Sequence, residues 1–376
     1  MTTRPYLNRR SLMLAAAASS IGMPVLAQGR PIRFGCTVDA SGVEKANGTS
    51  LFLGASACVE GINRAGGLQG RPLELVMADD QFKPELAREN ALRFQGDPGM
   101  IGLISPLGTR QTAAVMEAVH DMAIVGPNTG TAALRKVSPP NLFWVRASYD
   151  EEVDALIENA ATVGITRIGV VYPNDALGKG VFAAIERSLA ARKIKPVVVA
   201  TTPSTISTEV GPAAQQIAAA APQLVLMVLA GVLPRFVAAF RKAGGHSTLY
   251  GLSIGASAAN LHELGEQARG IGFAIVVPSP FSPKHEIVRR YQADMAAAGS
   301  TAFSLPTLEG YINARIIWEA LRRAGPQVTR EGLIDALAGL TKLDLGGMTI
   351  SYGRDNRIGG RFVDIAVIGT AGRILS

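Results

Sequence analysis

Two adjacent carboxylates, Asp79 and Asp80, are the first side chains whose types and spacing could do chemistry. They follow residues 73–78, an apolar run with the composition of a buried strand. Such a pair can exchange protons with a substrate or share a metal ion. Both roles need partners, and the four histidines form no i, i+4 pair and have no cysteine nearby. We therefore expect no metal site and no cofactor. One carboxylate should cap the helix beginning near Pro84, and the other should be hydrated.

The run Gly251–Gly255 matches the G-x-S-x-G pattern of serine hydrolases, which would make Ser253 a nucleophile. That mechanism needs an acid and then a histidine later in the chain. The last histidine, His285, precedes the first aspartate after Ser253. Only Glu263 or Glu266 could then be the acid, and nothing marks either residue. We predict a polar loop at a strand end and no catalytic residue.

Apolar runs alternate with helical patterns along nearly the whole chain after residue 30. This order of strand and helix predicts parallel sheets with right-handed connections. Two such series predict an α/β protein with two Rossmann-like lobes. The expected strands lie at 32–38, 73–78, 100–105 and 123–127 in the first series, and at 167–173, 196–201, 224–231, 248–253 and 272–278 in the second.

The last third of the chain has a different pattern. Apolar side chains from Tyr311 to Leu321 recur at helical spacing, and a second helix is expected at 330–338. Residues 346–353 and 360–369 then predict an antiparallel strand pair. No proline-rich or serine-rich linker separates the two series, which favours strand-like crossovers that act as a hinge.

The N-terminus has the features of an export signal. A basic start precedes a short apolar stretch, and small residues end at Ala27, after which we expect cleavage. Arg9 and Arg10 fit a twin-arginine signal, although an ordinary basic start would also contain them. Cleavage would lower the net charge from +7 to +4. No cysteine follows the cleavage point directly, so we expect no lipid anchor and a periplasmic protein.

The composition is that of a packed globular protein, with 48% hydrophobic and 18% charged residues. Aromatic residues make up only 6%, and no run of Lys or Arg offers a surface for nucleic acid. The two cysteines, Cys36 and Cys58, are compatible with a disulfide or with two buried thiols. Their spacing does not decide between these states.

Three segments together resemble periplasmic substrate-binding proteins of the leucine/isoleucine/valine-binding type. They are INRAGGLQGRPLELVMADDQFKP (62–84), IGVVYPNDALGKG (168–180) and LEGYINARIIWEALRRAG (308–325). The resemblance implies a type I periplasmic binding fold, with two lobes joined by three hinge crossovers and a ligand closed between them. It implies a first lobe of residues 28–146 plus 277–347 and a second of 147–276 plus 348–376. The segment 143–152 resembles a branch of the family whose ligands are poorly defined.

The resemblance also implies a ligand site at the carboxyl ends of the strands. In the family, backbone N–H groups and hydroxyls of the first lobe bind the α-carboxylate of an amino acid. The positions expected to contact ligand here are Ser105, Leu107, Gly108, Thr109, Asn128, Thr129, Gly130, Thr131, Tyr172, Asp175, Leu177, Gly231, Ser253 and Glu309.

Three positions depart from the family pattern. Pro106 replaces a residue that often donates a hydroxyl, and Leu177 replaces an aromatic residue that commonly covers the ligand. Ser253 lies near the usual site of an acid that neutralises the α-ammonium. Because a buried ammonium needs a partner, these departures favour a carboxylate or another small metabolite without a cationic group. An amino acid remains compatible if Glu309 or Asp175 turns inward.

The resemblance predicts a monomeric, non-enzymatic binding component of an ABC importer that delivers a small polar metabolite to permease subunits. The competing prediction is a ligand sensor of the same fold that signals to a receptor. Neither role involves nucleic acid.

Overall fold

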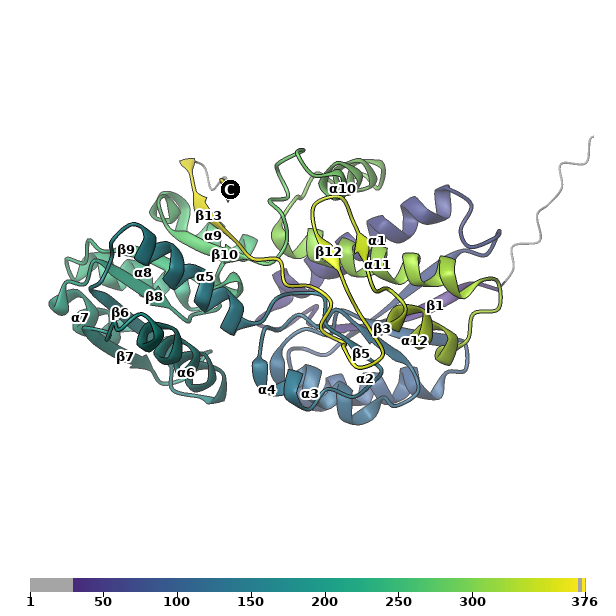
Figure 1. Cartoon of the computed structure of the whole chain (residues 1–376), viewed down its shortest axis with the longest axis horizontal. Helices are drawn as coiled ribbons and strands as arrows, with labels where there is room; N and C mark the ends of the chain where they lie inside the picture. The colour runs from purple at the N-terminus through teal and green to yellow at the C-terminus, as the bar shows by residue number, and fades with distance from the viewer. Residues whose placement is uncertain (1–29, 371–373, 376) are drawn as a thin grey trace, which may run out of the picture.

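The structure is a computed structural model that describes residues 30–370 and 374–375. The predicted export signal, residues 1–27, lies outside the described residues. Figure 1 shows two lobes side by side, with the chain passing between them more than once. Within the described ranges, no helix has both the length and the apolar character needed to cross a bilayer.

The first lobe is built on a five-stranded parallel sheet with the order β2-β1-β3-β4-β5. In β1, from Ile32 to Val38, every residue except Arg33 is almost completely buried, as expected for a strand covered on both faces. Helices α2 and α3 pack together on one face, and α1, α10, α11 and α12 form the other layer. The strands are β1 (Ile32–Val38), β2 (Leu73–Asp79), β3 (Met100–Ile104), β4 (Ala123–Val125) and β5 (Leu142–Phe143). The helices are α1 (Lys45–Arg64), α2 (Pro84–Gly96), α3 (Thr109–Ala118), α4 (Ala132–Lys136), α10 (Glu286–Ala297), α11 (Leu305–Ala324) and α12 (Arg330–Ala338).

The second lobe is built on a seven-stranded sheet with the order β14-β13-β10-β9-β8-β6-β7. The strands from β7 to β10 run parallel, whereas β13 and β14 form an antiparallel edge. The strands are β6 (Ile168–Pro173), β7 (Val198–Thr202), β8 (Leu224–Met227), β9 (Thr248–Gly251), β10 (Gly272–Ile275), β13 (Asp364–Ile368) and β14 (Ile374–Leu375). The α-helices are α5 (Tyr149–Thr162), α6 (Ala176–Ala191), α7 (Gly211–Ala220), α8 (Leu233–Lys242) and α9 (Ala258–Leu264); short 3₁₀ turns span Ser253–Gly255 and Gly265–Ala268.

The predicted fold class, two α/β lobes with parallel sheets, is confirmed. The antiparallel pairing predicted for residues 346–353 and 360–369 is wrong. Within the first segment, β12 (Thr349–Ile350) pairs with β11 (Leu343–Asp344) in a separate two-stranded sheet. Within the second, β13 pairs with β10. Both segments have strand patterns, but the alternation that predicts a strand does not specify its partner.

Three connections run between the lobes. The first follows β5 and leads into α5, and the second follows β10 and leads into α10. The third carries the chain back to β13. Ile358 forms an isolated β-bridge with Trp144, next to β5 of the first lobe, so the third passage lies between Ile358 and Asp364. The lobe limits inferred from the sequence remain a prediction.

Asp79 and Asp80 do not cap α2, so that expectation is wrong. The residue at the helix N-cap is Lys83, and no side chain caps the helix there. Asp79 instead accepts hydrogen bonds from the Ala40 and Gln81 N–H groups, at 2.9 Å each. Asp80 is completely buried and accepts hydrogen bonds from the Thr37 hydroxyl and the Phe82 N–H, at 3.0 Å each. The pair therefore ties together the loops after β1 and β2.

The two cysteines are free and buried, one in β1 and one in α1. Burial, with a smaller contribution from Asp80, raises the pKa of Cys36 to about 12. The structure thus shows the two buried thiols rather than the disulfide.

Candidate functional site

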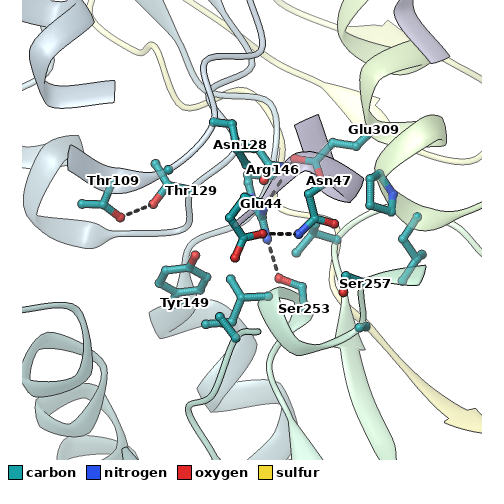
Figure 2. A pocket seen from close by; sticks show the side chains of 18 of the residues that line it. Glu44, Asn47, Thr109, Asn128, Thr129, Arg146, Tyr149, Ser253, Ser257 and Glu309 are labelled. Atoms are coloured by element: carbon teal, nitrogen blue, oxygen red, sulfur yellow. Dashed lines mark hydrogen bonds and ion pairs between the residues drawn. The ribbon is translucent and has the colours of Figure 1, made fainter. Parts of the chain in front are cut away.

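A cavity of about 110 Å³ lies between the lobes, and both lobes contribute to its wall. The first lobe supplies residues of α1, α11 and the loops after β3 and β4. The second lobe supplies the loops after β8 and β9 and the start of α6. Residues of the first two crossovers, Arg146 and Val276–Val277, also line the cavity, as do Phe82, Tyr149 and Thr205. Figure 2 shows polar side chains from these separate elements pointing toward one another.

Eight of the fourteen predicted contact residues line this cavity. They are Leu107, Gly108, Thr109, Asn128, Thr129, Leu177, Ser253 and Glu309. Thr109 and Thr129 share a hydroxyl hydrogen bond of 2.7 Å, which holds the loops after β3 and β4 together. The contact of these eight residues with a ligand remains a prediction.

The other six predicted residues lie outside the cavity wall and have other contacts. The Ser105 hydroxyl accepts a hydrogen bond from Asn313, and Gly130 packs beneath Tyr149. Thr131 is the N-cap residue of α4. Tyr172 stacks on Phe182 with ring centroids 4.5 Å apart.

Asp175 and Gly231 complete this set of six. Asp175 caps α6 and accepts hydrogen bonds from Thr205, so it does not turn inward. Gly231 borders a neighbouring cavity rather than the main one.

Arg146 is the centre of a buried charged cluster that the sequence reasoning missed. Its side chain is 4% exposed. One guanidinium nitrogen lies 3.4 Å from the Glu152 carboxylate, and another lies 3.5 Å from the carboxylate of Glu309. The guanidinium also donates a hydrogen bond to the Ser253 hydroxyl. Ser253 in turn donates to Glu152 through its N–H and its hydroxyl, at 2.8 Å each.

The cluster joins both lobes through the first crossover. Arg146 lies on that crossover, Glu309 on α11 of the first lobe, and Glu152 and Ser253 belong to the second lobe. Local sequence positions these groups: a capping box between Ser148 and Glu151 begins α5 just before Glu152. A second box, Ser304 with Thr307, begins α11. The signal that could have found Arg146 is an arginine directly after an apolar strand end.

Burial and pairing act in opposite directions on the pKa values of this cluster. Burial disfavours the charged guanidinium, but Glu309, Tyr149 and Glu152 together outweigh it, so the pKa of Arg146 lies above its usual value. Burial raises the pKa values of Glu152 and Glu309, and Arg146 lowers them only in part. A hydrogen bond from Asn128 further favours the charged form of Glu309.

The cavity wall carries carboxylates, one of them at a position that the sequence had named as a possible inward-facing acid. Glu309 turns inward, and Glu44, at the start of α1, also lines the wall. Glu152 lies behind Ser253, at the position where the sequence showed only a hydroxyl. Because Glu309 lines the cavity, the condition under which an amino acid remains compatible is met, and the preference for a ligand without a cationic group stays a prediction.

None of the remaining wall residues was predicted from the sequence. Asn47 follows Glu44 by one helical turn, and Tyr149 begins α5. The other missed residues are Phe82, Thr205, Ala230, Ile254, Ala256, Ser257, Val276, Val277, Leu305 and Pro306. Most are apolar or hydroxyl side chains in loops, and such residues have no distinctive spacing.

Solved structures resemble this chain over nearly its whole length. A substrate-binding periplasmic protein from Ralstonia solanacearum is 31% identical with a TM-score of 0.82, and the match covers 92% of this chain and 99% of that one. An extracellular ligand-binding receptor from Verminephrobacter eiseniae is 26% identical with a TM-score of 0.81, and the match covers 92% and 100%.

A curated relative, an amino acid binding protein from Pseudomonas aeruginosa, is 22% identical over 195 residues. The match covers 51% of this chain and 52% of the relative, so the chain spans about half the length of this curated relative. The periplasmic binding protein family matches residues 31–372. The resemblance read from the sequence is thereby confirmed, and this chain belongs to the periplasmic binding proteins, which bind substrates and are not enzymes.

Proposed function

We propose that this protein is the extracytoplasmic solute-binding component of an ABC importer. It binds a small polar metabolite, an amino acid or a carboxylate, between its lobes and delivers it to a membrane permease. The observation that carries the proposal is one cavity lined by both lobes, at which Arg146 of the first crossover pairs with Glu309 of the first lobe and bonds Ser253 of the second. A binding protein needs such a site because its two lobes must sense the same ligand.

The cavity wall combines apolar surface with a few fixed polar groups, as in small-molecule sites. Leu107, Leu177 and Ile254 belong to the apolar part. Hydroxyls and amides, such as those of Thr109 and Asn128, can orient a ligand through hydrogen bonds. Closure on the ligand stabilises one lobe arrangement only if the ligand contacts both lobes, and this cavity permits that.

The proposal is tested first by thermal unfolding of the purified protein with amino acids, aromatic and aliphatic carboxylates, and amides. A true ligand at roughly a hundred times its Kd adds about 2.7 kcal/mol of stability, which is a readable rise in the midpoint. If no compound in these classes raises the midpoint, the proposed binding function is wrong.

The importer role needs a second experiment. Deleting the gene should abolish high-affinity uptake of the labelled ligand by whole cells, and restoring it should recover uptake. Unchanged uptake, together with a lost transcriptional response to the ligand, would instead identify a sensor.

A further inference from the structure

Glu44 occupies a position that the surrounding chain is built to hold. The buried Asp39 carboxylate accepts hydrogen bonds from the N–H groups of Ser41 at 3.0 Å, of Glu44 at 2.7 Å, and of Gly42. The loop between β1 and α1 is thus wrapped around one carboxylate. This arrangement fixes Glu44 at the start of α1, with its side chain toward the second lobe.

The Glu44 carboxylate lies where two cavities meet. It lines the main cavity and a neighbouring one of about 150 Å³, together with Asn47, Ile254 and Ser257. Across the gap is Gly231 of the second lobe, where an added Cβ would come within 3.8 Å of a Glu44 oxygen. Figure 2 shows Glu44 among the polar side chains of the main cavity.

Among the described residues, no basic side chain pairs with Glu44. The hydrogen bond its carboxylate accepts comes from the Asn47 amide, at 2.6 Å. Burial, and then the charge of Asp39, raises the pKa of Glu44. Across the two cavity walls, the basic side chain is Arg146, whereas the acids are Glu44, Glu309 and Glu263. Arg146 is already paired with Glu152 and Glu309.

Arg146 also has one donor without a partner among the described residues. The Nε of Arg146 is buried without a hydrogen-bond partner, although the side chain lines the main cavity and is only 4% exposed. A buried donor without an acceptor is costly, so a ligand oxygen that accepts from it would be stabilised.

We propose that Glu44 recognises a positively charged nitrogen of the ligand, and that the ligand is a small organic cation with an oxygen acceptor for Arg146. A basic amino acid belongs to this class. The proposal rests on the proposed binding function and narrows it, because net negative walls favour a ligand with net positive charge. Plain carboxylates carry no cationic group. Aliphatic amino acids carry only the α-ammonium, whose charge their own carboxylate balances, so they lack the second, side-chain nitrogen that Glu44 would bind.

The test compares three probes of matched length: lysine, 2-aminoheptanoate, which has a methyl group in place of the side-chain ammonium, and heptanoate. Each is titrated calorimetrically into the full-length protein and into Glu44→Gln, whose amide oxygen can still accept from Asn47. Lysine should bind most tightly, and Glu44→Gln should weaken it by at least about tenfold. The affinity for 2-aminoheptanoate should change by less than about threefold.

Glu60→Gln is the matched control. Glu60 is an exposed residue on the same helix, and within residues 30–370 its ion pair is with Arg64. Its loss therefore changes the net charge without touching the cavity. It should leave lysine affinity unchanged. If Glu44→Gln folds poorly, Glu44→Asp takes its place in the test. It keeps the charge on a shorter side chain and should retain part of the lysine affinity.

The proposal is overturned if lysine binds no tighter than the other two probes, or if Glu44→Gln binds lysine as the unchanged protein does. Failure of all three probes also overturns it. If another class from the wider thermal screen then binds, the binding function stands and only the role of Glu44 is wrong. If no class binds, both proposals fail.

Discussion

Arg146 pairs with two buried carboxylates through a single guanidinium, so each member of this cluster depends on the others. Glu152 is completely buried, and Glu309 is 5% exposed. Removing one partner of a buried ion pair leaves an uncompensated charge, which is more costly than the net contribution of the intact pair.

We therefore expect Arg146→Ala to destabilise the protein by about 3–5 kcal/mol. Urea unfolding at pH 7 measures the change. The control is Arg187→Ala, which removes an exposed pair with Asp150 and should cost less than about 1 kcal/mol. Equal losses in the two variants would show that the buried cluster carries no special penalty.

Asp80 gives a prediction of pH dependence. Burial raises its pKa to about 6, with added repulsion from Asp39 and Asp79, while hydrogen bonds from Phe82 and Thr37 oppose the rise. A carboxyl group whose folded pKa is raised favours folding when protonated. Its stabilising contribution is present at low pH and is lost as the pH rises through about 6.

Relative to Asp80→Asn, the unchanged protein should therefore lose about 1 kcal/mol of unfolding free energy between pH 5 and pH 8. Asparagine keeps the acceptor oxygen but does not ionise. Denaturant curves of both proteins at the two pH values provide the measurement. A constant difference between the two proteins would contradict the raised pKa.

At the scale of elements, the close packing of α1 against α11 positions both cavity acids of the first lobe. Glu44 precedes α1, and Glu309 lies in α11 next to Gly310. A Cβ on Gly54 of α1 would collide with the Thr307 carbonyl oxygen, and a Cβ on Gly310 would collide with that of Leu51. These two glycines therefore let the helix backbones approach each other closely.

Gly54→Ala should consequently destabilise the protein by about 1–3 kcal/mol, because the two helices must separate. Gly180 in α6 is the matched control, since nothing lies within 4 Å of an added Cβ there. Gly180→Ala should stabilise by about 0.5–1 kcal/mol through helix propensity alone. Thermal unfolding of both variants tests whether the two substitutions change the stability in opposite directions. A stabilising Gly54→Ala would mean that the helices are not in close backbone contact.

At the scale of the whole molecule, the three passages between the lobes allow a hinge motion without unfolding either sheet. The main cavity is lined from both lobes, so ligand contacts and lobe orientation are linked. Arg146, on the first crossover, pairs with Glu309 of the first lobe and with Glu152 of the second. The crossover is therefore linked to both lobes at the cavity.

We expect saturating ligand to reduce the radius of gyration measured by small-angle X-ray scattering. The lobes close because the closed form makes more contacts with the ligand. A non-binding analogue at the same concentration should leave the scattering curve unchanged. Identical curves with and without a ligand of proven affinity would show that binding occurs without closure.

Much of the fold could be predicted because its signals are local. Short, mostly apolar runs such as 32–38 and 224–231 predict strands buried on both faces, and the helices between them favour parallel pairing. The limits of this reasoning appear at β12 and β13. Both were predicted as strands, but their partners, β11 and β10, are chosen by tertiary contacts.

The sequence by itself determined the α/β class, the two lobes and the family, because these depend on periodic patterns and segments contiguous in the chain. Only the tertiary structure decided the chemistry of the cavity. Arg146 and Glu309 are 163 positions apart in the chain and yet form an ion pair. Neither residue shows its partner in its local sequence, because an ion pair depends on distance in space and on exclusion of water, which spacing does not encode.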